Sequence, residues 1–191
     1  MAEYKMEKEI KTILASRIKN SLQDEGLKRA AVLIPLFKKD GEYHILFTKR
    51  TEKVEHHKGQ ISFPGGRQDK QDRNLLATAL REAEEEMGIA PKDVQILGEL
   101  DDFCTATTDF CISPFVARIP YPYPFRVNPH EIAEVIEAPL SALRQESQMR
   151  QEIFLRDGEP FPVYFYEYQG YTIWGATARI LKELLDLLPS P

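Results

Sequence analysis

Four glutamates fall within five successive positions near the middle of the chain. Glu82, Glu84, Glu85 and Glu86 belong to the run REAEEEMG. Carboxylates this close together repel one another, so a helix that carries them either faces water or binds cations. The residues around them must decide between these two possibilities.

The apolar residues of the same region predict how this helix is oriented. They recur at the i, i+4, i+7 and i+11 positions of a buried stripe, namely Leu76, Leu80, Ala83 and Met87. This phase places Glu82, Glu85 and Glu86 together on a neighbouring face, where they can converge on one site. Glu84 points elsewhere, and we expect it to be solvated.

A sharp turn precedes the helix. Residues 60–63 are typical of a strand, and Pro64, Gly65 and Gly66 form a turn that we expect to continue as neither strand nor helix. The glycines allow the backbone to pass close beside the helix. A plain tight turn without a functional role would use the same residues.

The turn and the acidic helix together resemble a known motif. The positions that match are Gly66, Asp72, Arg81, Glu82, Ala83, Glu85, Glu86, Gly88 and Ile89. They are similar to the Nudix box, which has a glycine, an acid and then REUxEExGU, with U an aliphatic residue. The acid here is Asp72 rather than glutamate, and eight residues rather than seven separate it from Arg81. The resemblance implies a Nudix-type α/β/α sandwich with a central mixed β-sheet.

A second, narrower resemblance precedes the box. Residues 46–66 are similar to the signature LLTxR(S/A)xxxRxxxGxxxFPGG of the coenzyme A pyrophosphatase group of Nudix hydrolases. The agreeing positions are Leu46, Thr48, Arg50, Gly59, Phe63, Pro64, Gly65 and Gly66. Phe47 replaces leucine, Thr51 replaces serine or alanine, and Glu55 stands where the signature has arginine. The lengthened box and the ending IWGATARILKELL are also similar to that group, so the resemblance covers residues 29–188.

This resemblance implies a pyrophosphohydrolase that depends on Mg²⁺ or Mn²⁺. The implied substrate is coenzyme A or an acyl-CoA, which would give 3′,5′-ADP and 4′-phosphopantetheine or its acyl form. The alternatives are another nucleoside diphosphate linked to a moiety, such as ADP-ribose or NADH, and a nucleotide-binding module without catalysis. To split a pyrophosphate, the negative charge on its oxygens must be neutralised and a water molecule must be activated. Metal ions held by carboxylates can do both.

The resemblance also implies roles for the motif residues. We expect Glu85 and Glu86 to be the main metal ligands and Glu82 to be a further ligand or the catalytic base. The carbonyl of Gly65 would be another ligand. Arg81 lies one turn before Glu85, where a guanidinium could orient a carboxylate, although a surface i,i+4 ion pair would have the same spacing.

A basic group precedes the turn and could receive the phosphates of a nucleotide. It consists of Lys49, Arg50, Lys53, His57 and Lys58. Arg50 is the best candidate because it matches the signature, while each of the others is equally compatible with a solvated surface charge. The predicted substrate-binding residues are therefore Arg50, Lys53, His57 and Lys58.

Residues 121–129, with the sequence YPYPFRVNP, predict an extended loop because prolines interrupt both helix and strand. The loop is either a substrate-facing flap or a surface segment whose rings cover the core. Glu131 and Glu134 follow it, in a region from which some Nudix enzymes draw an extra ligand or base. The sequence does not choose between these two acids, and both are compatible with a surface position.

The remaining segments predict an α+β fold. Helices are expected at residues 7–22, 139–144 and 175–188, and strands at residues 29–37, 43–50, 94–100, 112–119, 132–137, 153–156 and 163–168. Asp40-Gly41 and Asp157-Gly158 are typical hairpin turns. Pro35 suggests an edge or irregular stretch in the first strand.

Length and composition indicate one domain over residues 1–191, with an N-terminal helix in 1–25 and a C-terminal helix in 175–188. The chain has 191 residues, 42% of them hydrophobic, and a net charge of −5, which argues against a surface that coats nucleic acid. Cys104 and Cys111 are expected to be buried thiols rather than a disulfide. Without a signal peptide core or a membrane span, we expect a cytoplasmic protein with a small nucleotide substrate. A homodimer is left open.

Overall fold

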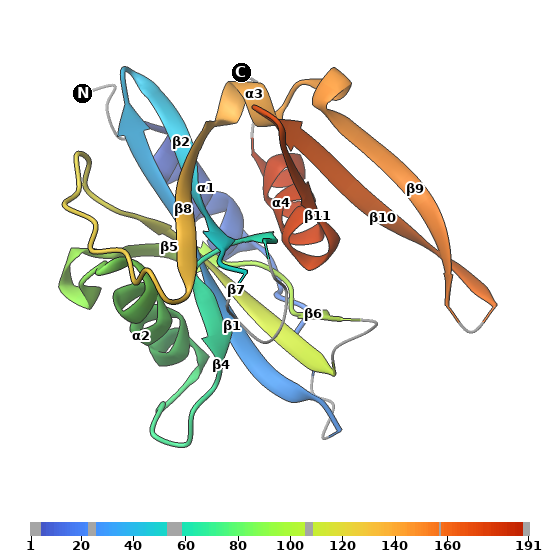
Figure 1. The fold of residues 1–191 in the computed structure, drawn as a ribbon, viewed down its shortest axis with the longest axis horizontal. Coiled ribbons are helices and arrows are strands. Elements are labelled where there is room, and N and C mark those ends of the chain that lie inside the picture. Colours follow the sequence, from blue (N-terminus) through green and yellow to red (C-terminus); the bar gives the residue numbers. More distant parts are fainter. Residues whose placement is uncertain (1–4, 23–25, 53–58, 106–108, 157, 189–191) are drawn as a thin grey trace.

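A mixed β-sheet with helices on both faces forms the body of the computed structural model, and a second, smaller sheet extends from it (Figure 1). The structure describes residues 5–22, 26–52, 59–105, 109–156 and 158–188. The helices are α1 (Lys5–Ser16), α2 (Leu75–Met87), α3 (Leu140–Leu143) and α4 (Gly175–Leu187). The strands are β1 (Lys28–Lys39), β2 (Glu42–Arg50), β3 (Ile61–Ser62), β4 (Gly65–Arg67), β5 (Gln95–Glu99), β6 (Phe103–Cys104), β7 (Phe110–Arg118), β8 (Ile132–Pro139), β9 (Met149–Arg156), β10 (Glu159–Tyr168) and β11 (Tyr171–Trp174).

Strand β1 lies at the centre of the large sheet. It pairs in parallel with β7 along its length, and on its other side it pairs antiparallel with β4 and then with β2. Strand β2 in turn pairs with β3 and β8, while β7 pairs with β5 and β6. Strands β9, β10 and β11 form the small antiparallel sheet. The expectation of an α+β fold with a central mixed sheet is confirmed.

The two faces of the large sheet bury separate hydrophobic clusters. One face packs against α2 through residues that include Leu33, Leu46 and Ala83. The other packs against α1, α4 and the small sheet through residues that include Phe47 and Leu181. Because side chains alternate along a strand, neighbours such as Leu46 and Phe47 belong to different clusters. The result is the predicted α/β/α sandwich.

Pro35 lies in an internal strand rather than at an edge. On one side β1 pairs with β4 at residues 30–32 and with β2 at residues 36–39, so Pro35 lies in the gap between these two partners. Proline has no N–H to donate, and a gap in the ladder requires none. The expectation of an edge was wrong, whereas that of an irregular stretch was correct.

Two further expectations need correction. Helix α1 ends at Ser16 rather than continuing to residue 22, and Ile18 beyond it is 98% exposed instead of completing the apolar stripe. The turn at Pro64 does continue as a strand, because Gly65–Arg67 pairs with β1 as β4. A Cβ on Gly65 would lie 2.4 Å from the Ala31 carbonyl oxygen, so only glycine allows this close pairing.

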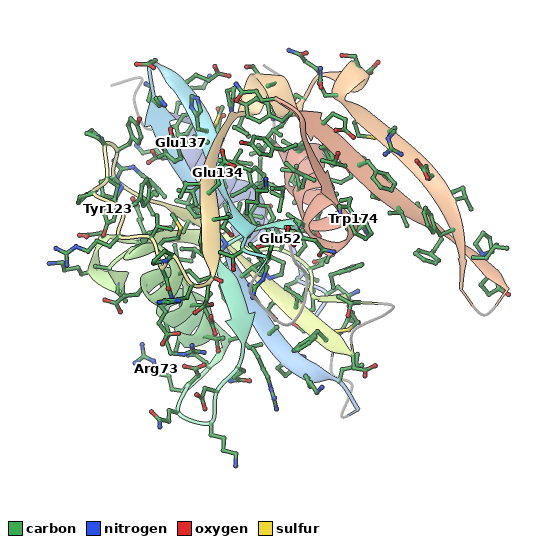
Figure 2. All side chains as sticks on the ribbon, in the orientation of Figure 1. Glu52, Arg73, Tyr123, Glu134, Glu137 and Trp174 are labelled. Atoms are coloured by element: carbon green, nitrogen blue, oxygen red, sulfur yellow. A yellow bond between two sulfur atoms is a disulfide. The ribbon has the colours of Figure 1, made fainter. Side chains whose placement is uncertain are left out.

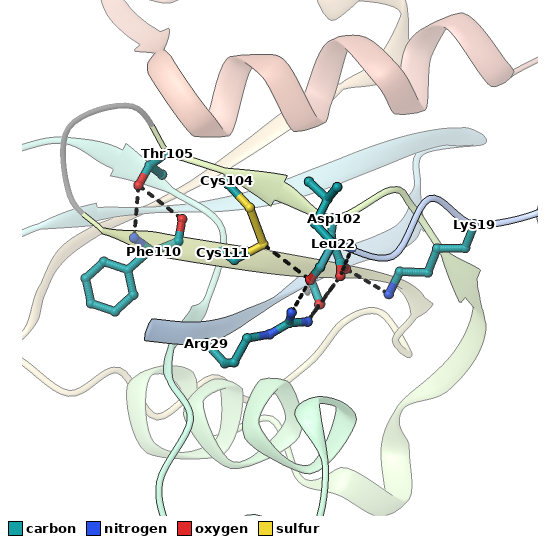
Figure 3. Close-up of a disulfide and its surroundings, with 9 residues drawn as sticks. Lys19, Leu22, Arg29, Asp102, Cys104, Thr105, Phe110 and Cys111 are labelled. Atoms are coloured by element: carbon teal, nitrogen blue, oxygen red, sulfur yellow. Dashed lines mark hydrogen bonds and ion pairs between the residues drawn. A yellow bond between two sulfur atoms is a disulfide. The ribbon is translucent and has the colours of Figure 1, made fainter. Parts of the chain in front are cut away.

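Cys104 and Cys111 form a disulfide, which corrects the expectation of two free thiols (Figure 3). They lie directly opposite each other on β6 and β7, with their Cα atoms 4.0 Å apart. The short strand β6 falls inside a segment that the sequence indicates as loop. The pairing of the two residues therefore could not be foreseen.

Beside the disulfide, buried Asp102 holds the segment after α1 against the sheet (Figure 3). Its carboxylate accepts hydrogen bonds from Ser113 Oγ at 2.6 Å and from the backbone N of Leu22 at 3.1 Å. It also forms ion pairs with Lys19 and Arg29. This buried carboxylate has several partners, as a buried charge requires.

None of the helices within the described ranges is long and apolar enough to cross a membrane.

Candidate functional site

Helix α2 has defined ends that fix which residues it presents to the site. At its start the side chain of Asn74 accepts a hydrogen bond from the backbone N of Ala77 at 2.8 Å. At its end Gly88 has a φ of 69° and donates its N–H to the Glu84 carbonyl at 2.8 Å. The acidic positions therefore all lie within one regular helix.

The buried face of α2 differs from the predicted one. The buried residues are Thr78, Ala79, Ala83, Glu86 and Met87. Glu86 thus belongs to the buried face itself, where it contacts Gly65 at the start of β4, rather than to a neighbouring polar face. Glu84 is exposed, as expected.

The carboxylate of Glu86 is almost wholly withdrawn from water, with 2% of its side chain exposed. It accepts a hydrogen bond from the Gly65 backbone N at 3.2 Å, and its other oxygen lies 3.6 Å from Arg50 Nη1. Burial raises the pKa of Glu86 to about 8, although Gly65 and Arg50 act in the opposite direction. These two partners therefore do not fully offset the burial of its charge.

Arg81 binds acids from two parts of the box. Its Nε and Nη2 atoms donate to the two carboxylate oxygens of Asp72 at 3.0 and 2.9 Å. Its Nη1 atom donates to Glu82 and to Glu85, at 2.9 Å in each case. Hydrogen bonding to Arg81 lowers the pKa of Asp72 to about 2. Arg81 is therefore not a plain surface i,i+4 partner of Glu85.

Glu82 lies beside the glycine turn. A Cβ on Gly66 would come within 2.5–2.6 Å of the Glu82 carboxylate, so glycine leaves the space that this side chain fills. Burial raises the pKa of Glu82, while the bond from Arg81 acts in the opposite direction. Glu85 differs from Glu82 and Glu86, since 55% of its side chain is exposed.

The predicted basic residues are divided between the two faces of the sheet. Arg50 points to the α2 face, where it contacts Glu86. Lys49 points to the opposite face, with its Nζ atom 5.6 Å from the centre of the Tyr171 ring. Lys53, His57 and Lys58 lie outside the described residues, as does Glu55.

The two acids that follow the proline-rich loop also lie on different faces. Glu131 lies on the α2 side, where its charge adds to the repulsion among Glu82 and Glu86. Glu134 lies on β8 opposite Lys49 and accepts a hydrogen bond from Tyr171 of the small sheet (Figure 2). The geometry therefore favours Glu131 over Glu134 as a member of the site.

The rings of the loop between β7 and β8 cover the core. Tyr121, Tyr123 and Phe125 pack against the hydrophobic cluster beneath α2. The hydroxyl of Tyr123 (labelled in Figure 2) donates to Asp93 and accepts from the backbone N of Ala90, both at 2.9 Å. These contacts favour the loop as a surface segment whose rings cover the core, rather than as a substrate-facing flap.

The donor groups around Glu86 suit a divalent cation. Glu86 is a buried carboxylate whose charge is incompletely offset, and Glu82 and Glu131 lie near it. Oxygen donors of this kind are preferred by Mg²⁺ and Mn²⁺. Within the described ranges no three acidic, histidine or cysteine groups already converge as a ligand set. Arg81 binds Glu82 and Glu85, and Arg50 pairs with Glu86, so an ion would share these carboxylates with the two guanidinium groups.

A family comparison agrees with this fold. The model of the NUDIX domain matches residues 27–158, which is more than half of the chain. The chain therefore belongs to the Nudix hydrolases, and the expectation of an enzyme of this family is confirmed. Nudix hydrolases generally use divalent metals such as Mg²⁺ or Mn²⁺.

Individual relatives support the same assignment. The chain is 39% identical over 157 residues to a Photorhabdus laumondii protein named "Uncharacterized Nudix hydrolase NudL", with 82% of this chain and 83% of that protein covered. An Enterobacter protein of the same name is 40% identical, with 82% and 81% covered. A MutT/nudix family protein from Enterococcus faecalis has the same fold, with a TM-score of 0.60 at 14% identity and coverage of 86% of this chain and 63% of that one.

Asn128 and Glu131 are the part of the site that the sequence does not define. Asn-Pro at residues 128–129 is a typical start of a β-turn, because asparagine can accept a bond from the turn and proline fixes the next φ. That signal predicts the turn, but it does not predict that the turn lies beside α2. The backbone bond from Asn128 N to the Glu86 carbonyl, at 2.9 Å, places it there.

Proposed function

We propose that the chain is a pyrophosphohydrolase that cleaves the diphosphate of coenzyme A or an acyl-CoA. The products would be 3′,5′-ADP and 4′-phosphopantetheine or its acyl form. The observation that carries this proposal is the contact of Glu86 with Arg50 and Gly65. Arg50 and Gly65 belong to the coenzyme A pyrophosphatase signature, and Glu86 belongs to the Nudix box. Residues of both motifs therefore meet at one carboxylate.

The proposed cation ligands are Glu82, Glu85, Glu86 and the Gly65 carbonyl, with Glu131 as an added acid. Glu86 and Glu82 supply buried oxygens, whereas Glu85 would approach from the exposed side. Bound Mg²⁺ or Mn²⁺ neutralises charge on the diphosphate and makes water a better nucleophile. All of the proposed ligands except the Gly65 carbonyl are acidic side chains, and a bound cation would relieve the repulsion among them.

Arg81 and Glu82 are the proposed catalytic pair. Arg81 holds Glu82 through Oε1, which leaves Oε2 to accept the proton of the attacking water. Burial raises the pKa of Glu82, and a base is most effective when its pKa approaches the working pH. Arg81 also binds Asp72, so the guanidinium that orients Glu82 is itself fixed from a second side.

Arg50 is the proposed substrate-binding residue for which the structure gives a position. Its guanidinium lies beside Glu86 at the end of β2, with Nη1 3.6 Å from Glu86 Oε1. A guanidinium can bind phosphate oxygens in a bidentate manner. Lys53, His57 and Lys58 remain proposed partners of the phosphates on sequence grounds alone.

The test is turnover of a substrate panel with Mg²⁺ and with Mn²⁺. The panel contains coenzyme A, an acyl-CoA, ADP-ribose and NADH, and the products are separated by chromatography. We expect coenzyme A or the acyl-CoA to have the highest kcat/KM and to yield the two predicted products. If ADP-ribose or NADH is cleaved rapidly while coenzyme A is not, the substrate assignment is wrong. If no compound of the panel is cleaved with either metal, the diphosphate assignment itself is rejected.

A further inference from the structure

The turn at residues 128–131 is attached to both sides of the site. On the α2 side, Asn128 N donates to the Glu86 carbonyl and Arg126 N donates to the Met87 carbonyl, both at 2.9 Å. These carbonyls belong to the last turn of α2, which has no later helical N–H to pair with them. The loop is thereby held in a fixed position beside Glu86.

On the β2 side, Thr51 holds the other end of the same turn. Its backbone N donates to the Glu131 carbonyl at 2.8 Å, and its Oγ1 atom donates to the His130 carbonyl at 2.9 Å. Thr51 directly follows Arg50, which contacts Glu86. The backbone of the turn therefore bridges the two elements that supply the site.

The side chain of Asn128 links this backbone to the carboxylate of Glu131. Its Nδ2 atom donates to Glu131 Oε1 at 3.0 Å, and its Oδ1 atom accepts from His130 N at 3.1 Å. A carboxylate can only accept and a backbone N–H can only donate, so these two partners fix which way the amide points. An aspartate could make the second bond but not the first.

Glu131 faces the acids of α2. Asn128 donates its backbone N–H to the Glu86 carbonyl and its Nδ2 atom to Glu131 Oε1, so one residue joins the last turn of α2 to the Glu131 carboxylate. The Glu131 carboxylate therefore lies near the acids of α2, and like charges at close range repel one another. Without a donor to hold it, the Glu131 side chain would be expected to turn away from this repulsion toward water.

We propose that Asn128 is a positioning residue that keeps the Glu131 carboxylate beside Glu82 and Glu86, where it strengthens the binding of a divalent cation. This inference rests on the proposed function, since it assumes that the cation binds among these acids. Asn128 acts through Glu131 and does not itself touch the cation or the substrate. Partners that orient a ligand in this way commonly change metal affinity by tenfold or more.

The test is a double-mutant cycle read by Mn²⁺ binding, with free Mn²⁺ measured by electron paramagnetic resonance. Asn128→Ala should weaken Mn²⁺ binding about tenfold in the otherwise unchanged protein. In the Glu131→Ala background the same substitution should cause no further loss, because the group that it positions is absent. The backbone bonds of the turn and Pro129 are retained in both variants, so we expect both to fold.

Two results would overturn the inference. One is unchanged Mn²⁺ affinity in Asn128→Ala, and the other is an equal loss with and without Glu131, which would indicate a structural role alone. Asn74→Ala is the matched control, since it removes an asparagine hydrogen bond at the other end of α2 and should lower the melting temperature without changing Mn²⁺ affinity. Asn128→Ser provides the same cycle with a milder change if the alanine variant does not fold.

Failure of this inference can be distinguished from failure of the proposed function. The unchanged protein could bind Mn²⁺ and cleave coenzyme A while Asn128→Ala binds Mn²⁺ with the same affinity. In that case only the role of Asn128 is wrong. If the unchanged protein does not bind Mn²⁺ among these acids, so that Glu86→Gln leaves its Mn²⁺ binding unaltered, the proposed site is wrong and the role of Asn128 falls with it.

Discussion

Arg50 Nη1 lies 3.6 Å from Glu86 Oε1, and the two side chains come from opposite ends of the motif region. Arg50 ends β2, while Glu86 lies near the end of α2. A buried carboxylate with one guanidinium and one backbone N–H nearby retains a charge that burial penalises, which is why its pKa rises to about 8. A bound cation would therefore stabilise the charge of Glu86 more than that of the other acids.

Glu86→Gln should lower kcat by at least about a hundredfold while the fold remains intact. Glutamine has nearly the same shape and can still accept the bond from Gly65, but it lacks the charge that a cation needs. Turnover with Mg²⁺ measures the loss of kcat, and the circular dichroism spectrum checks that the fold is intact. Glu84→Gln is the matched control, because it removes the same charge from an exposed position of the same helix. Near-normal turnover of Glu86→Gln would refute its role as a ligand.

The same substitution should change how stability depends on pH in the presence of a chelator. Glu86 keeps its proton in the folded state up to a pKa of about 8, whereas the ordinary pKa of a glutamate, expected in the unfolded chain, is 4.5. The contribution of Glu86 to stability is therefore full below pH 4.5 and is lost as the pH rises toward 8. Relative to the unchanged protein, Glu86→Gln should gain at least about 1 kcal/mol between pH 5 and pH 8. Urea denaturation at both pH values measures this, and a constant difference would contradict it.

Asp72→Asn should lower stability at neutral pH by about 1.5–3 kcal/mol, the range for a hydrogen bond to a charged group. Hydrogen bonding to Arg81 lowers the pKa of Asp72 in the folded state to about 2, against an ordinary pKa of 3.8 for an aspartate. Its contribution is therefore present above pH 3.8 and is lost as the pH falls toward 2. Denaturation curves at pH 7 and pH 2.5 should show the difference shrinking. Asp186→Asn, which removes an exposed partner of Lys182, should cost little at either pH.

Gly66→Ala should reduce turnover by about tenfold or more with little loss of fold. The added Cβ would come within 2.6 Å of the Glu82 carboxylate, whose flexible side chain must then move away from its place beside Arg81. Kinetics with saturating Mg²⁺ measures the loss. Gly170→Ala is the control, because that glycine has open space around it but a φ of 83°, so alanine there should cost stability and not turnover. Unchanged kinetics in Gly66→Ala would mean that the position of Glu82 does not matter for catalysis.

The hydrophobic periodicity of the sequence predicts most of the strands and the central helix, because each half-buried element has a regular pattern. The same periodicity predicts the wrong buried face for α2. Glu86 occupies a buried position that periodicity reserves for apolar residues, and Leu80 is only partly buried. A functional acid on a buried face breaks the pattern from which the phase is read. The sequence therefore indicates which glutamates matter but not which of them lies deepest.

The missed features share a physical cause, which is contact between segments distant in the chain. Cys104 meets Cys111 only because β6 forms beside β7, and Glu131 is distinguished from Glu134 only by the face of the sheet on which each lies. Strand alternation separates Lys49 from Arg50 in the same way. None of these relations has a local signature, since each depends on how the sheet is assembled.

The large sheet separates the acids of the candidate site from the hairpin of β9 and β10. The acids, the glycine turn and Asn128 lie on the α2 side, whereas the small sheet packs on the opposite side with α4 (Figure 1). Exposed residues of the hairpin such as Ile153 and Leu155 lie outside this arrangement, so changes in them would leave the spacing of the acids unaltered.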